Sequence, residues 1–180
     1  MKPKAKPGKK AWARVRLFAM DVDGILTDGS VYIASDGTET KRFSVLDGMG
    51  IMMLHEAGLQ IAWISARMSG ATTLRAEELK ISHVIQGGHD KLGSLTALLA
   101  KMGLSMDQCV FMGDDVLDVP ALRAAGIGVT VPNAMPVALA AARFVTRRAG
   151  GSGAVREVCD LLLSARGGAS RNSDVRRSTI

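Results

Sequence analysis

Two pairs of aspartates stand where apolar runs of the chain end. Asp21 and Asp23 follow the first run, and Asp114 and Asp115 follow a later one. If both runs are parallel strands, their carboxyl ends meet at one edge of a sheet and four carboxylates gather there. Like charges at short range cost stability unless a cation lies among them. An all-oxygen set of donors suits Mg²⁺ better than zinc or copper, so the two pairs predict a magnesium site.

Further polar residues could bind a phosphate group at the same edge. Ser65 and Arg67 end another apolar run, Asp90 precedes Lys91 at an expected helix start, and Asp118 follows the second acidic pair. Taken singly, each has an ordinary explanation, because Ser65 and Asp118 could begin helices and the cations could be solvated surface charges. Together, in one chain, they indicate a site that combines a metal ion with a bound phosphate.

An alternation of strands and helices is expected to position these residues. Strands are expected at residues 16–20, 59–64, 83–85, 109–112, 127–131 and 144–146, and helices near 50–57, 69–79, 92–102, 117–125 and 154–165. Gly58, Gly103 and Gly126 directly follow helices and suit the left-handed residue that ends them. The pattern predicts an α/β fold with a doubly wound, mostly parallel, Rossmann-like sheet.

One insertion interrupts the alternation. Residues 31–33 and 40–45 are expected to be extended and flank a turn sequence at 35–38, which predicts a β-hairpin. No other insertion is long enough for a separate cap domain, so the cover of the site must be small or come from another subunit.

Length and composition limit the other possibilities. The 180 residues suit a single domain, which we expect at 14–166 between a basic flexible tail at 1–13 and a flexible tail at 167–180. No run approaches the roughly 20 apolar residues of a membrane span, and no secretory signal is recognisable, so we expect a cytoplasmic protein without a membrane partner.

Cys109 and Cys159 lack the spacing of a zinc site and are expected to be buried. The +6 net charge gathers in the tails, and only 4% of residues are aromatic, so no nucleic-acid partner is expected.

The order of the four motifs carries a resemblance. Asp21-Val-Asp-Gly, Ile64-Ser-Ala-Arg, Asp90-Lys and Gly113-Asp-Asp resemble, in this order, the four motifs of the haloacid dehalogenase superfamily of phosphatases. Within it, residues 21–28, 43–50, 86–91 and 149–157 are similar to those of the phosphatases of 3-deoxy-D-manno-octulosonate 8-phosphate (KDO 8-phosphate). The similarity extends over residues 14–166 and implies an enzyme of lipopolysaccharide precursor biosynthesis.

The resemblance implies a role for each motif residue. Asp21 would be the nucleophile that forms an aspartyl phosphate, and Asp23 would act as general acid and then as general base. Ser65 and Lys91 would neutralise the phosphate charge. The Mg²⁺ ligands would be the carboxylates of Asp21 and Asp114 and the backbone carbonyl of Asp23. The residues expected to orient water around the ion are Asp115 and Asp118.

The substrate would be a small sugar acid phosphate. Contacts with it are expected from Asp47, Gly48, Ala66, Arg67 and Arg156. The resemblance also implies a homotetramer, in which the hairpin and the C-terminal segment of a neighbouring subunit help to close the site. Ala66 stands where such phosphatases often have glycine; its backbone N–H remains available to an anion.

Other interpretations remain open at this level. The same chemistry could act on another sugar acid phosphate, such as a sialic acid 9-phosphate. A receiver-like phosphoacceptor domain also holds Mg²⁺ with aspartates, a hydroxyl and a lysine at strand ends. Its acidic pair, acceptor and lysine follow a different order along the chain, which disfavours it here.

Overall fold

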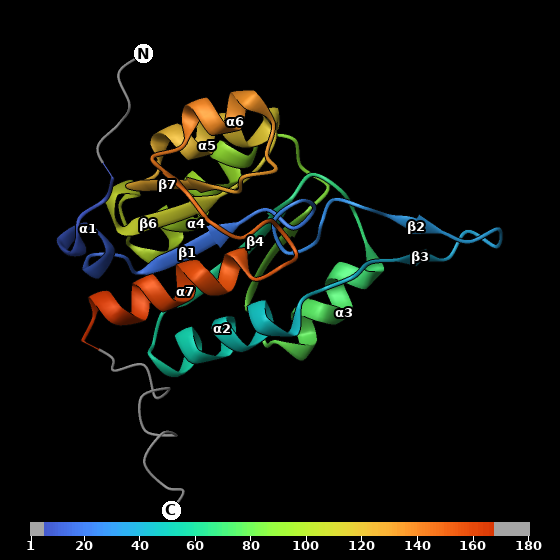
Figure 1. Ribbon diagram of the computed structural model, residues 1–180, viewed down its shortest axis with the longest axis horizontal. Coiled ribbons are helices and arrows are strands. Elements are labelled where there is room, and N and C mark those ends of the chain that lie inside the picture. Colours follow the sequence, from blue (N-terminus) through green and yellow to red (C-terminus); the bar gives the residue numbers. More distant parts are fainter. Residues whose placement is uncertain (1–5, 168–180) are drawn as a thin grey trace, which may run out of the picture.

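The sheet in the computed structural model, which describes residues 6–167, is built of six parallel strands in the order β5-β4-β1-β6-β7-β8 (Figure 1). The strands are β1 (Leu17–Met20), β4 (Gln60–Ser65), β5 (His83–Gln86), β6 (Cys109–Met112), β7 (Ile127–Thr130) and β8 (Phe144–Val145). Every neighbouring pair is parallel, which confirms the expected doubly wound α/β fold. Strands β1 and β6 are buried throughout, because helices cover both faces of the sheet.

Helices form a layer on each face. The α-helices are α1 (Lys9–Ala13), α2 (Val45–Glu56), α3 (Gly70–Glu78), α4 (Lys91–Met102), α5 (Val119–Ala124), α6 (Pro136–Ala141) and α7 (Ala154–Ala165). Short 3₁₀ helices η1 (Met106–Gln108) and η2 (Val116–Asp118) precede β6 and α5. Side chains of α1, α2, α3 and α7 share one buried cluster, and those of α4, α5 and α6 share the other. Cys109 and Cys159 are buried in opposite clusters, as expected of small apolar side chains.

The predicted hairpin projects from the body of the molecule (Figure 1). It consists of β2 (Tyr32–Ile33) and β3 (Glu39–Thr40), which pair in antiparallel fashion. Its second strand is shorter than the expected 40–45: β3 ends at Thr40, and α2 begins already at Val45. The described residues hold no other inserted domain, so the expectation of a fold without a separate cap is confirmed for them.

Three local details differ from the expectations. Residues 9–13, expected in the basic tail, form α1, because Trp12 is buried edge-on against Phe144 with ring centroids 5.6 Å apart. Helix α6 was not expected from the sequence. Gly126 does not adopt the left-handed conformation of Gly58 and Gly103; a Cβ there would lie 2.6 Å from the backbone oxygen of Asp107, so close approach explains the glycine.

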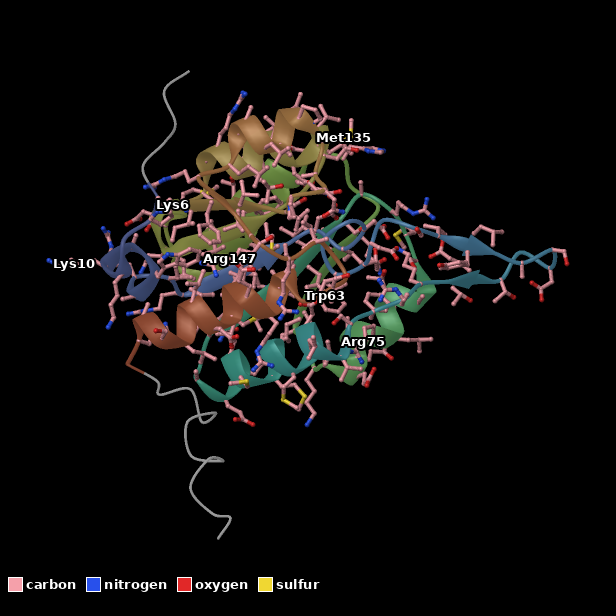
Figure 2. The ribbon with its side chains drawn as sticks, viewed as in Figure 1. Lys6, Lys10, Trp63, Arg75, Met135 and Arg147 are labelled. Atoms are coloured by element: carbon pink, nitrogen blue, oxygen red, sulfur yellow. The ribbon has the colours of Figure 1, made fainter. Side chains whose placement is uncertain are left out.

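Of the tails expected at 1–13 and 167–180, residues 1–5 and 168–180 lie outside the described residues. Lys6 and Lys10 lie at the end of the molecule opposite the hairpin (Figure 2). Across residues 6–167, every helix is too short or too polar to cross a membrane.

Candidate active site

The two acidic motifs meet at the carboxyl ends of neighbouring strands. Strand β1 pairs with β6 so that Met20 lies opposite Met112, and the backbone N–H of Asp21 donates to the carbonyl of Met112 over 2.8 Å. Asp21 and Asp114 therefore leave the sheet at the same edge, as the sequence predicts.

Three carboxylates and one ammonium form the centre of this site. One oxygen each of Asp21, Asp114 and Asp118 lies within 4.8 Å of the others. The Lys91 ammonium lies 2.8 Å from Asp21 Oδ2 and 2.6 Å from Asp118 Oδ1, and its side chain is buried. Helix α4 places Lys91 here, because Asp90 caps the helix by accepting from the N–H of Gly93.

The electrostatics of the cluster follow from burial and mutual repulsion. Burial, reinforced by the charge of Asp118 and opposed by Lys91, raises the pKa of Asp21 from 3.8 to about 7. Burial, with the charges of Asp21 and Asp118, likewise raises the pKa of Asp114 to about 7. Burial alone would lower the pKa of Lys91, but the two neighbouring carboxylates raise it instead. One ammonium thus leaves the three carboxylates short of positive charge.

This deficit fits a divalent cation. The donors are carboxylate oxygens, which Mg²⁺ prefers, and the backbone of the first loop lies close against Asp114. A Cβ on Gly24, which has a φ of 86°, would lie 2.0 Å from Asp114 Oδ2, so only glycine fits there. The donor set therefore suits the expected magnesium ion.

The two remaining acidic residues differ in position. Asp118 is buried, and its Oδ2 accepts from the backbone N–H groups of Asp114 and Asp115 over 2.9 and 3.1 Å. Both of its oxygens are thus engaged, so it holds the loop and Lys91 in place. Asp115 is exposed and caps η2 by accepting from the N–H of Val116 over 2.6 Å.

Asp23 lies beside two cations, one of which the sequence did not single out. The Lys41 ammonium lies 2.7 Å from Asp23 Oδ1, and the Nε of Arg67 lies 3.7 Å from Oδ2. Glu39 of β3 accepts from Arg67 Nη2 over 2.8 Å and from the Ser69 hydroxyl over 2.6 Å. No motif identified Lys41; the only sequence clue was its position in the second strand of the predicted hairpin.

The motif after β4 reaches the same edge. Ser65 ends the strand and is buried, and its hydroxyl accepts from the backbone N–H of Arg67 over 3.2 Å. Ala66 is half-buried between them, while about half of the Arg67 side chain is exposed. These residues border the carboxylate cluster from the neighbouring strand.

Three residues expected to bind substrate make other contacts within the subunit. Asp47 is buried and accepts from the backbone N–H groups of Gly153 and Arg156 over 3.2 and 2.8 Å, so it caps α7. Burial raises the pKa of this carboxyl although those hydrogen bonds oppose the shift. Gly48 packs against Arg75, and the Arg156 guanidinium lies 2.9 Å from Asp160. Within the described residues, no contact joins them to the carboxylate cluster.

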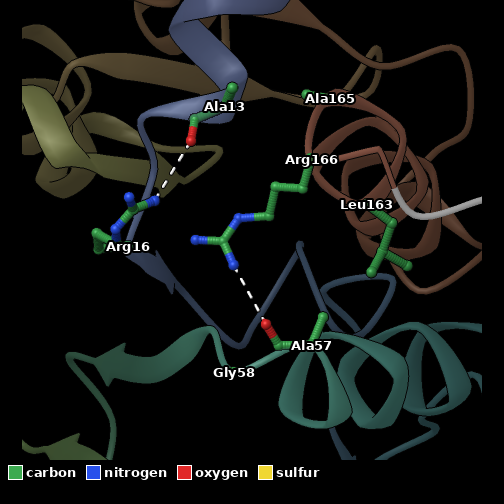
Figure 3. Close-up of a pocket in the computed structure, with 7 residues that line it drawn as sticks. All are labelled: Ala13, Arg16, Ala57, Gly58, Leu163, Ala165 and Arg166. Carbon is green, nitrogen blue, oxygen red and sulfur yellow. Dashed lines mark hydrogen bonds between the residues drawn. The ribbon is translucent and has the colours of Figure 1, made fainter.

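A separate hollow of about 760 Å³ lies at the other end of the sheet (Figure 3). Arg16, which precedes β1, and Arg166 line it together with the ends of α2 and α7. The Arg166 guanidinium donates to the carbonyls of Ala57 and Val15, and Arg16 donates to that of Ala13. The two guanidinium groups therefore donate to backbone carbonyls at or near the C-terminal ends of helices, which carry partial negative charge.

Comparisons with known proteins agree with this geometry. Residues 49–158 match a family model described as haloacid dehalogenase-like hydrolase. The chain is 41% identical over 153 residues to the 3-deoxy-D-manno-octulosonate 8-phosphate phosphatase of Escherichia coli K12, covering 85% of this chain and 81% of that protein.

Two solved structures are similar over most of the chain. The phosphatase of the same name from Moraxella catarrhalis, in complex with magnesium, phosphate and KDO, superposes with a TM-score of 0.87 at 46% identity, covering 88% of this chain and 91% of that one. The cobalt-bound phosphatase from Haemophilus influenzae has a TM-score of 0.84 at 34% identity, covering 87% and 92%.

Proposed function

The chain belongs to the haloacid dehalogenase-like hydrolases, and on that basis we propose that it is a Mg²⁺-dependent phosphatase that converts KDO 8-phosphate to KDO and phosphate. One observation carries the chemistry: the buried carboxylate of Asp21 contacts the Lys91 ammonium and belongs to an acidic cluster that could hold a divalent ion. The similarity of the chain to KDO 8-phosphate phosphatases supports the substrate assignment.

The first step would be nucleophilic displacement at phosphorus. A carboxylate oxygen of Asp21 forms a bond to the phosphorus atom while the bond from phosphorus to the ester oxygen breaks. The departing oxygen keeps the electron pair and takes a proton from the Asp23 carboxyl. The sugar acid leaves as an alcohol, and Asp21 carries the phosphoryl group.

The second step would return the enzyme to its starting state. Asp23, now a carboxylate, takes a proton from a water molecule whose oxygen attacks the phosphorus atom. The bond from phosphorus to Asp21 breaks, the electron pair returns to the Asp21 carboxylate, and phosphate departs. One side chain thus serves as acid and then as base.

Charge neutralisation explains the rest of the site. A carboxylate that approaches a phosphate dianion meets repulsion, which Lys91 and the Ser65 hydroxyl would reduce. Mg²⁺, held by the carboxylates of Asp21 and Asp114 and the carbonyl of Asp23, would supply further positive charge beside the phosphate. The backbone N–H of Ala66 and the exposed Arg67 side chain would contact the substrate.

We also propose that the protein is a cytoplasmic homotetramer. Val45, Leu46, Met49 and Met52 expose apolar side chains along α2, and Tyr32 and Ile33 do so on the projecting hairpin. Neighbouring subunits would cover these surfaces and help to close the site. Light scattering after size-exclusion chromatography tests this, and Met49→Asp, which puts a charge on the α2 surface, should reduce the assembly.

Phosphate release from a panel of sugar phosphates tests the function. We expect a strong preference for KDO 8-phosphate that excess EDTA abolishes. Release from other sugar acid phosphates alone, such as a sialic acid 9-phosphate, would keep the mechanism and change the substrate. No release from any compound would contradict the proposed activity.

A further inference from the structure

Lys41 is a charged side chain that the mechanism above does not use. It follows β3, and its side chain is wholly shielded from solvent. Burying an ammonium costs several kcal/mol of hydration unless charged or polar partners replace the lost water. A side chain needed only to fill space at the base of the hairpin could be apolar, so the partners of this ammonium indicate why a lysine stands there.

The partners of Lys41 converge on Asp23. Its ammonium lies 2.7 Å from Asp23 Oδ1, 3.8 Å from Glu39 Oε1 and 3.4 Å from the hydroxyl of Thr72, which is buried in α3. The contact with Asp23 is the shortest of the three. Since Glu39 is also paired with Arg67 and Ser69, the carboxylate that depends most on Lys41 is Asp23.

The contact also distinguishes the two oxygens of Asp23. Lys41 takes Oδ1, whereas Oδ2 faces only the half-exposed guanidinium of Arg67 at 3.7 Å. Arg67 is on the exposed side of the site and is expected to turn to the substrate. Oδ2 is then the oxygen left to exchange a proton with the leaving group.

We propose that Lys41 is a positioning residue, which holds Asp23 through Oδ1 so that Oδ2 faces the leaving oxygen. The inference rests on the proposed function, because it assigns Lys41 to the acid and base step of Asp23. It also gives the hairpin a task within its own subunit: β3 and the residue after it carry the groups that contact Asp23 and Arg67. A displacement of about 1 Å at a reacting group can cost on the order of 10²-fold in rate.

Replacement of Lys41 by methionine, of similar length and without charge, tests this idea. The measured quantity is kcat/KM, which covers the steps up to departure of the leaving group. It is compared for KDO 8-phosphate, whose alkoxide needs a proton, and for p-nitrophenyl phosphate, whose phenolate leaves without one. We expect Lys41→Met to lose about 10²-fold on the sugar phosphate and less than about 10-fold on the aryl phosphate.

Further variants separate positioning from folding. Asp23→Asn should show the same dependence on the leaving group, and the double variant Asp23→Asn with Lys41→Met should be no slower than Asp23→Asn alone. Lys41→Arg should recover part of the lost rate. Arg42→Met is the matched control, because Arg42 adjoins Lys41 but is exposed and paired with Asp28; its rates should equal those of the wild type.

The outcomes distinguish a folding defect, a wrong role for Lys41 and a wrong function. Circular dichroism shows whether Lys41→Met is folded, and Lys41→Gln provides a second uncharged variant. Equal losses on both substrates, no loss, or additive losses in the double variant would overturn the role of Lys41 while leaving the phosphatase intact. A wild-type protein that releases phosphate from neither compound would instead contradict the proposed function.

Discussion

Asp114→Asn should stabilise the metal-free protein at pH 8. Asp114 has its pKa raised from 3.8 to about 7 by burial and by the charges of Asp21 and Asp118. Above pH 7 the folded protein must therefore hold this carboxyl in a charged form that it disfavours. The asparagine amide has nearly the same size and no charge, so the substitution removes this cost.

The magnitude follows from the shift in pKa. A pKa raised from 3.8 to about 7 corresponds to about 4 kcal/mol of unfavourable free energy in the folded protein above pH 7. Since Asp114 is only half-buried, solvent screening should reduce the gain to roughly half, about 2 kcal/mol. For a chain of this size, this corresponds to a rise in Tm of roughly 4–8 °C.

Thermal unfolding in EDTA measures this effect at two pH values. The folded-state pKa of Asp114 is raised, so its contribution to stability is present at low pH and is lost as the pH rises through about 7. At pH 5 the wild-type carboxyl is protonated in the folded protein but largely ionised in the unfolded chain, so the variant should gain less than at pH 8, and the gain should vanish only below about pH 3.8. Added Mg²⁺ should stabilise the wild type more at pH 8 than at pH 5, because protons compete with the ion, and should stabilise the variant far less.

The matched control is Asp115→Asn. This neighbouring carboxylate is exposed and caps η2, a role that asparagine fills equally well, so its Tm should change little. Two results would contradict this reasoning: a lower Tm of Asp114→Asn in EDTA at pH 8, or an undiminished stabilisation of the variant by Mg²⁺. Either would show that Asp114 is not a carboxylate that neighbouring charges destabilise and a cation stabilises.

Three other substitutions test separate parts of the site. Asp21→Asn should abolish phosphate release, because an amide is a poor nucleophile, and should leave the circular dichroism spectrum unchanged. Hydrolysis near the wild-type rate would exclude Asp21 as the nucleophile. Lys91→Met should lower kcat by at least about 10²-fold and also lower the Tm in EDTA at pH 8, because two carboxylates lose their shared cation. Asp47→Ala should lower the free energy of unfolding in urea by about 1 kcal/mol through loss of the α7 cap and leave kcat/KM near the wild-type value. A large rise in KM would instead indicate that Asp47 binds the substrate.

Local patterns were enough to predict the sheet and most of the acidic cluster. Apolar runs followed by paired aspartates indicate strand ends, and parallel strands bring such ends to one edge whatever the details of packing. Asp21, Asp114 and Lys91 are therefore found together as expected. The predicted start of α2 near residue 50 was wrong: the helix begins at Val45, and its first turn buries Asp47, which accepts hydrogen bonds from the distant start of α7.

The sequence by itself determined the alternation of strands and helices, the edge where the chemistry gathers and the family of the chain. Only the tertiary structure decided that Lys41 lies beside Asp23 and Asp118 beside Lys91, and that Asp47 caps α7 instead of joining the carboxylate cluster. Each of these contacts joins segments distant in the chain, and Asp47 and Arg156 are 109 residues apart. Periodicity and capping preferences act over a few residues, whereas the partner of a buried charge is selected by the folded chain as a whole.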